Sequence, residues 1–244
     1  MAPLPALITR ENFKTFLESF DTVLTDCGWC VWDRLIGQAH VTLNTLQALG
    51  KKVFFVTNNS TKSRDDYVEK CGCLGFKATK EDILSSAYVL AQYLKQQGFQ
   101  KVYVMGMGGI VKELQAEGIQ STGREPVRGT GCVVRCVETV AERLATVMGK
   151  PSTKMFSVIQ EKNSLDPKRT LMIEAKHFRC NTDILFGKNC GLQTLVVLSG
   201  VTTQADLEKW AASDDPEQHA LLADYCLTQL DDLLAFLDPK QEQC

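Results

Sequence analysis

Long apolar runs and an excess of charge of one sign are both absent from this sequence of 244 residues. No stretch approaches the roughly 18 to 20 apolar residues that cross a membrane, and the N-terminal residues lack the basic stretch and apolar run of a secretory signal. The formal net charge is −2 and the basic residues are scattered, so neither nucleic acid nor a membrane is indicated as a partner. We therefore expect a cytoplasmic protein.

Internal repeats and low-complexity tracts are missing as well. Hydrophobic residues make up 44% of the chain, which is enough for one sizeable core. We therefore expect a single domain over residues 1–244. One loop-like joint, at residues 118–131, interrupts the regular pattern.

Cysteine, in contrast, is plentiful, with ten residues. Without a secretory signal, these are expected to be thiols rather than a disulfide framework. Several occupy positions where a small buried hydrophobic side chain would serve: Cys132, Cys136, Cys190 and Cys226.

Short apolar runs alternate with longer segments of helical periodicity, which is typical of a parallel sheet covered by helices on both faces. The predicted strands are residues 23–27, 52–57, 101–106, 170–174 and 194–200, with a short strand and a closing helix in the tail. The predicted helices are residues 40–49, 63–74, 80–97, 109–117, 131–148, 154–162 and 183–190. This order predicts an α/β fold with a doubly wound, Rossmann-like parallel sheet. Because ligands of such sheets bind at the carboxyl ends of the strands, residues 26–32, 57–60 and 174–183 are the candidates for chemistry.

Four motifs occur in a recognisable order at these positions. A strand ends in Asp26, a second ends in TNNST at 57–61, a helix is followed by GKPS at 149–152, and a later strand leads to TDILFGKNCG at 182–191. Each motif alone is weak, but their order and placement resemble the haloacid dehalogenase (HAD) superfamily. The closest resemblance is to the branch of 4-nitrophenyl phosphatases, phosphoglycolate phosphatase and pyridoxal phosphatase, and it runs through nearly the whole chain.

The resemblance implies a phosphomonoester hydrolase that works through an aspartyl phosphate. Asp26 matches the family's nucleophile, which splits hydrolysis into two easier displacements. Thr57, Asn58 and Asn59 match the residues that hold the phosphoryl oxygens. Lys150 matches the lysine that neutralises phosphate charge and orients the nucleophile.

The resemblance also implies Mg²⁺, which would let two anions approach each other. Its implied ligands are Asp26, the backbone carbonyl of Gly28, and Asp183. The family's main carboxylate ligand is replaced, since EAKHF at 174–178 stands where the family has Gly-Asp. Glu174 is the nearest substitute, although Mg²⁺ demands near-ideal octahedral geometry.

Two further departures concern catalysis and substrate access. The family's first motif has a second aspartate that acts as general acid and base, and Gly28 occupies its place here. The sizeable cap domain between the second motif and the lysine also has little counterpart, apart from the joint at residues 118–131. We therefore predict an HAD core with its cap largely absent and with weak or no turnover.

A different interpretation starts from the cysteines of the altered loops. Cys27, Cys30, His177 and Cys180 would project from neighbouring strand ends and make a Cys3His set, the ligand type of a zinc site or, less commonly, of an iron–sulfur centre. Ordinary thiols are the alternative for the same residues.

Two functional hypotheses follow from these observations. The first is a Mg²⁺-dependent phosphatase of reduced activity, and the second is an inert phosphatase-like module that binds phosphorylated ligands. Either would take a small phosphorylated metabolite or a phosphoprotein as its partner, and a homodimer is compatible with both.

Overall fold

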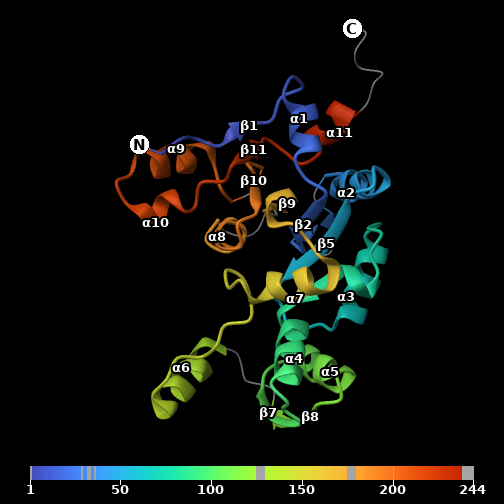
Figure 1. Cartoon of the computed structure of the whole chain (residues 1–244), viewed down its shortest axis with the longest axis vertical. Coiled ribbons are helices and arrows are strands. Elements are labelled where there is room, and N and C mark those ends of the chain that lie inside the picture. The colour runs from blue at the N-terminus through green and yellow to red at the C-terminus, as the bar shows by residue number, and fades with distance from the viewer. Residues whose placement is uncertain are drawn as a thin grey trace.

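The computed structural model describes residues 2–28, 30–31, 34–35, 37–124, 130–174, 180–199 and 201–237. Its centre is a seven-stranded sheet in which every neighbouring pair of strands is parallel (Figure 1). In spatial order the strands are β1 (Ala6–Leu7), β11 (Tyr225–Leu227), β10 (Gln193–Val197), β9 (Thr170–Ile173), β2 (Thr22–Asp26), β5 (Lys52–Thr57) and β6 (Ile83–Ser85).

Helices cover both faces of this sheet, as the sequence predicts. The helices of the described residues are α1 (Phe13–Glu18), α2 (Ala39–Ala48), α3 (Arg64–Cys73), α4 (Ser86–Gln96), α5 (Gly108–Ala116), α6 (Thr130–Ala141), α7 (Lys154–Asn163), α8 (Asp183–Asn189), α9 (Gln204–Ala212), α10 (Pro216–His219) and α11 (Asp232–Leu237), of which α6 projects away from the sheet. Cys132 and Cys136, which we expected to be buried, are both exposed on α6. Single 3-10 turns occupy Lys80–Asp82 and Pro167–Arg169. Two small sheets stand beside the main one: an antiparallel pair of β3 (Cys30–Val31) and β4 (Arg34–Leu35), and a parallel pair of β7 (Lys101–Met105) and β8 (Gln120–Arg124).

The side chains of the central strands point alternately to the two faces of the sheet and so contribute to two separate layers of the core. In β2, Val23 packs with α2 and α3, whereas its neighbour Leu24 packs with α4, α7 and α8. Successive side chains of a strand point to opposite faces, so a strand apolar at every position must be covered on both sides. All five residues of β2 are buried accordingly.

Three expected elements differ from the structure. The helix expected from residue 80 begins only at Ser86, because Ile83–Ser85 pairs with β5 as the edge strand β6 and the Ser85 hydroxyl caps α4. The helix expected over 131–148 ends at Ala141, since Glu142 has a left-handed backbone with φ of 51°. The run at 101–106 lies outside the main sheet and pairs with β8, which falls in the expected loop.

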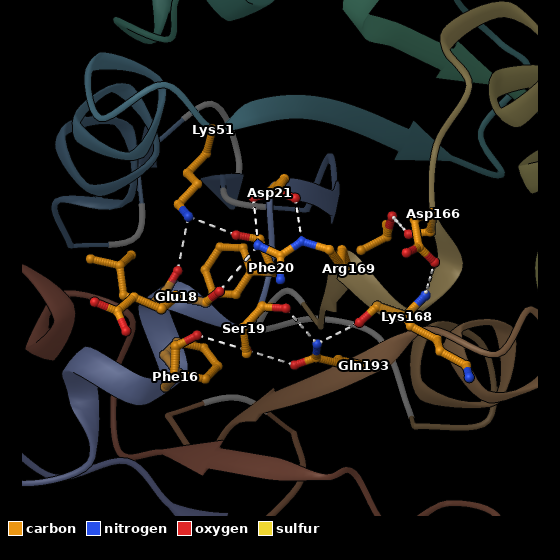
Figure 2. Close-up of polar contacts among 12 residues, drawn as sticks. Phe16, Glu18, Ser19, Phe20, Asp21, Lys51, Asp166, Lys168, Arg169 and Gln193 are labelled. Atoms are coloured by element: carbon orange, nitrogen blue, oxygen red, sulfur yellow. Dashed lines mark hydrogen bonds and ion pairs between the residues drawn. The ribbon is translucent and has the colours of Figure 1, made fainter.

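Polar side chains tie the amino ends of β2, β9 and β10 together (Figure 2). The Arg169 guanidinium donates to the Asp21 carboxylate, and the Gln193 amide donates to the backbone carbonyls of Ser19 and Lys168 at 3.0 and 2.7 Å. Lys51 donates to two more backbone carbonyls, in the segment that leads into β2. These contacts hold the amino ends of the strands together, and the carboxyl ends of the strands carry the candidate site.

A buried ion pair joins the β7–β8 region to the main sheet. Glu113 on α5, only 1% exposed, accepts hydrogen bonds from the backbone N–H and the Nε of Arg64 at 2.6 and 3.0 Å. The Arg64 guanidinium lies 3.6 Å from the ring centre of Tyr88. A Cβ on Gly109 would come within 2.5 Å of the Ser60 carbonyl oxygen, so α5 lies directly on the loop that follows β5.

Candidate functional site

The candidate site lies at the carboxyl ends of three adjacent strands. Asp26 is the last residue of β2 and Thr57 the last of β5, while Glu174 directly follows β9. Lys150 precedes α7, and Asp183 is the first residue of α8. Because β2 lies between β5 and β9, these separate parts of the chain meet at one edge of the sheet.

A buried cluster of three charges forms the centre of this site. The ammonium group of Lys150 lies 2.5 Å from Asp26 Oδ1 and 2.6 Å from Asp183 Oδ1, and it donates to the Val56 carbonyl at 3.1 Å. None of the three residues is more than 4% exposed. Burial opposes the charged form of Lys150, but Asp183 and Asp26 outweigh it and raise the pKa of the lysine. Burial likewise raises the pKa of Asp183, against the attraction of Lys150.

Two carboxylate oxygens of the cluster suit a cation. Asp26 Oδ2 and Asp183 Oδ2 are buried and have no hydrogen-bond partner among the described residues. Buried carboxylate oxygens normally accept hydrogen bonds or coordinate metals. Asp26 and Asp183 therefore fit a divalent cation, as the resemblance implies.

Glu174 does not complete a set of metal ligands with them. Its Oε2 accepts from the Cys180 thiol at 3.2 Å and its Oε1 from the Thr202 hydroxyl at 3.4 Å. Within the described ranges, no three His, Cys, Asp or Glu side chains are grouped so that they could hold a metal ion. The residue that we expected to replace the missing ligand is thus engaged elsewhere.

Burial raises the pKa of Glu174 to about 8, with a further contribution from the negative charge of Asp183. The folded protein therefore keeps this carboxyl protonated between its ordinary pKa of 4.5 and about pH 8, where the unfolded chain has released the proton. Folding takes up a proton in that window, so this group favours the folded state less as the pH rises through it.

The first prediction is that Glu174→Gln removes this pH dependence. Between about pH 5 and pH 8, the free energy of unfolding of the wild type should fall relative to the variant by at least about 1 kcal/mol. Urea denaturation at each pH measures the difference. The exposed Glu69→Gln serves as control and should leave the pH profile of the wild type unchanged. Parallel profiles for the wild type and Glu174→Gln would contradict the assignment of a protonated Glu174.

The loop after β5 is fixed by its own side chains. The Asn58 amide donates to the carbonyl of Lys150 at 2.8 Å, and its Oδ1 accepts from the backbone N–H of Lys150 at 2.7 Å. Thr57 Oγ1 accepts from the backbone N–H of Asn59 at 3.2 Å. A Cβ on Gly149 would come within 2.6 Å of Asn58 Oδ1. Asn58, expected on the phosphate, thus holds Lys150 in place in this structure.

Two of these contacts have no signal in the local sequence. The bond between Asn58 and Lys150 joins segments 92 residues apart, and Thr202 reaches Glu174 from 28 residues away. Only the capping box of Ser63 and Asp66, which begins α3 at the end of the loop, can be read from the local sequence.

The Cys3His alternative gains no support from the structure. Cys27 packs beside Tyr67 and Cys71 on one side of the sheet, whereas Cys180 contacts Glu174 and Thr202 in a different cluster. His177 and the side chain of Cys30 lie outside the described residues.

Among the described residues, no helix has the length and apolar character that crossing a membrane requires.

Two family models match the two parts of the chain that contain the site residues. Residues 23–120 match the profile of haloacid dehalogenase-like hydrolases, and residues 147–227 match that of HAD-hydrolase-like proteins. The first segment contains Asp26 and Thr57, and the second contains Lys150, Glu174 and Asp183.

Curated relatives resemble the chain along almost its whole length. Glycerol-3-phosphate phosphatase of Gallus gallus is 30% identical over 93% of this chain and 95% of its own length, and phosphoglycolate phosphatase 2 of Arabidopsis thaliana is 32% identical over 83% and 91%. The first alignment spans 300 residues, more than the 244 of this chain. The relative therefore carries segments that have no counterpart here.

Solved structures agree on the fold. A p-nitrophenyl phosphatase from Archaeoglobus fulgidus superposes with a TM-score of 0.74 and 24% identity, over 89% of this chain and 99% of that one. A glycerol phosphate phosphatase from Mycobacterium tuberculosis, in complex with magnesium, gives 0.72 and 20%, over 89% and 78%. Together with the parallel sheet and the buried acid–lysine cluster at its edge, these matches show that the chain belongs to the haloacid dehalogenase-like hydrolases.

Proposed function

We propose that this chain binds phosphate monoesters at the Asp26–Lys150–Asp183 cluster and hydrolyses them slowly through an aspartyl phosphate. The observation that carries the proposal is the position of the Lys150 ammonium group, between the two buried carboxylates and beside the Thr57 loop. A small phosphorylated metabolite or a phosphoprotein is the proposed ligand. The phosphatase activity named for the relatives supports this substrate class.

Each residue of the cluster has a chemical role in this proposal. An oxygen of Asp26 attacks phosphorus while the bond from phosphorus to the leaving oxygen breaks, and water later displaces the carboxylate to release phosphate. Lys150 offsets the negative charge that gathers when phosphate approaches two carboxylates. Thr57 and the backbone of its loop supply hydrogen-bond donors to the phosphoryl oxygens, and Asn58 positions Lys150.

A divalent cation fits the free oxygens of Asp26 and Asp183, and by the family resemblance we propose Mg²⁺ there. When bound, Mg²⁺ supplies charge neutralisation between nucleophile and phosphate. The engagement of Glu174 with Cys180 and Thr202 leaves the site one carboxylate ligand short, so weak affinity for the ion is part of the proposal.

Slow turnover is expected because position 28 is glycine. Glycine can neither protonate a leaving group nor take a proton from the attacking water, and such assistance is typically worth about 10²–10⁴ in rate. The same observation favours a second candidate function, a module that binds phosphorylated ligands without turning them over.

Hydrolysis of p-nitrophenyl phosphate by the wild type and by Asp26→Asn tests the proposal. We expect slow release of p-nitrophenol by the wild type and at least a roughly 100-fold loss in the variant, because an amide is a far weaker nucleophile. Binding of inorganic phosphate without hydrolysis would favour the binding module. Equal activity of the two proteins would show that the hydrolysis does not come from this site and would refute the proposal.

A further inference from the structure

The loop that follows β5 is held at both of its ends. At its beginning, the Asn58 side chain is hydrogen-bonded to both backbone groups of Lys150. At its far end, the backbone N–H of Arg64, the first residue of α3, donates to Glu113 Oε1 at 2.6 Å. We call residues 57–63 the phosphate loop, because its donors are the groups that we propose for the phosphoryl oxygens.

Helix α5 also packs directly against the phosphate loop. A Cβ on Gly109 would lie 2.5 Å from the carbonyl oxygen of Ser60 and 2.6 Å from that of Lys62. Only glycine therefore allows the helix and the loop to come so close. On the same helix, the Lys112 ammonium group lies 2.9 Å from Asp66 Oδ1, just beyond the loop. Helix α5 thus supports the far half of the phosphate loop.

The contact between Glu113 and Arg64 is buried and made of two hydrogen bonds. Glu113 is 1% exposed and Arg64 is 9% exposed, and Glu113 Oε2 accepts from the Arg64 Nε at 3.0 Å. The guanidinium also lies on the ring of Tyr88, whose hydroxyl accepts from Lys162. One carboxylate therefore fixes both the backbone and the side chain of Arg64, at a point where α3, α4, α5 and α7 meet.

Stability alone does not account for this ion pair. Taking two charges out of water costs so much free energy that an apolar pair of similar volume is often equally or more stable. An apolar side chain, however, cannot accept from the backbone N–H at the end of the phosphate loop. Ligand-binding groups need such support, because a displacement of about 1 Å can lower a rate by about 100-fold.

We propose that Glu113 is a positioning residue, which holds the phosphate loop in the shape that binds a phosphoryl group. It acts through the backbone of Arg64 and does not itself touch the ligand. The inference rests on the proposed function, since the ligand of the loop is the phosphoryl group named there. It adds that phosphate affinity depends on α5, a helix outside the Asp26–Lys150–Asp183 cluster.

Two double variants separate positioning from stability. The Gln variant, Arg64→Met with Glu113→Gln, removes both charges but keeps an oxygen that can accept from the backbone N–H of residue 64. The Leu variant, Arg64→Met with Glu113→Leu, removes both charges and this oxygen. In calorimetric titration with inorganic phosphate in the presence of Mg²⁺, the Gln variant should bind within about 3-fold of the wild-type Kd, and the Leu variant about 10-fold or more weakly.

Amide hydrogen exchange gives a second readout, which needs no ligand. The backbone N–H groups of Asn59 and Thr61 are hydrogen-bonded within the phosphate loop. They should exchange faster in the Leu variant than in the wild type and the Gln variant. The amides of β2 and β5 should stay equally protected in all three proteins, because the central sheet does not depend on the pair.

Gly109→Ala tests the same support without changing any charge. Its methyl group must displace the loop or the helix, so phosphate binding should weaken by about 10-fold or more. Gly72→Ala is the matched control, because a Cβ on Gly72 in α3 meets nothing within 4 Å. It should bind phosphate like the wild type.

The possible outcomes distinguish this inference from the proposed function. If the wild type binds phosphate and the Leu variant binds it equally well, the positioning role is wrong and the proposed function stands. Equal weakening in the Gln and Leu variants would assign the effect to the lost charges and also overturn the positioning role. Should the Leu variant not fold, Gly109→Ala decides, since phosphate binding equal to that of Gly72→Ala would overturn the inference. A wild type that neither binds phosphate nor hydrolyses p-nitrophenyl phosphate would overturn both proposals.

Discussion

Replacing Gly28 by aspartate is expected to raise the rate of phosphate ester hydrolysis by about 10²–10⁴-fold. Position 28 lies two residues after Asp26, the nucleophile that we propose, and the resemblance implies an acid and base at this position. The new carboxyl group would protonate the departing oxygen and then take a proton from the attacking water. The gain should be larger for an alkyl phosphate than for p-nitrophenyl phosphate, because the alkoxide leaving group needs the proton more.

Gly28→Asn is the matched control for this gain. Asparagine has the shape of aspartate but cannot exchange a proton at neutral pH, so it should leave the rate near that of the wild type. Steady-state rates with both substrates measure the effect. Equal gains for Asn and Asp would contradict the acid–base explanation, and no gain for Asp would show that the site lacks more than this one group.

Removal of the Lys150 charge should have the second large effect. Lys150→Met leaves Asp26 and Asp183 as neighbouring buried carboxylates without their cation, and loss of one partner from a buried ion pair typically costs about 3–5 kcal/mol. We expect a loss of stability of that size in urea denaturation near neutral pH. Phosphate ester hydrolysis should also become undetectable, because the charge that balances the phosphoryl group is gone.

Two variants separate these charge effects from general damage. Lys188→Met alters an exposed lysine on α8 and should change stability by less than about 0.5 kcal/mol. The double variant Lys150→Met with Asp183→Asn removes one negative charge as well, and it should recover part of the lost stability but none of the activity. A double variant no more stable than Lys150→Met alone would contradict the electrostatic account.

The sequence predicted the parts of the fold that depend on local pattern. The apolar runs of β2, β5, β9 and β10 are buried on both faces, so their continuous hydrophobic character is itself the signal. Local pattern does not predict the edge strand β6, the strand β8 or the pairing of β7 outside the main sheet, because contacts with distant strands decide all three. In β7, Tyr103 and Met105 remain exposed while Val104 packs on α4 and α5, a distribution that the run KVYVM does not reveal.

The candidate site also contains residues that the sequence predicts and contacts that it does not predict. The order of the motifs, through the family resemblance, predicts Asp26, Lys150 and Asp183 as site residues, and the structure brings their charges together. The partners of Glu174 could not be predicted, since Cys180 and Thr202 approach it from separate loops whose positions depend on the whole fold. The bond of Asn58 to Lys150 likewise exists only once β5 and the segment before α7 have met.

Mass spectrometry of the chain after brief exposure to p-nitrophenyl phosphate tests the central claim most directly. p-Nitrophenolate leaves readily without a proton, whereas breakdown of an aspartyl phosphate needs the base that Gly28 does not provide, so the covalent intermediate should accumulate. The account predicts a mass increase of about 80 Da on the peptide that contains Asp26, absent in Asp26→Asn and short-lived in Gly28→Asp. A phosphoryl group on any other residue, or none under conditions where p-nitrophenol is released, would contradict it.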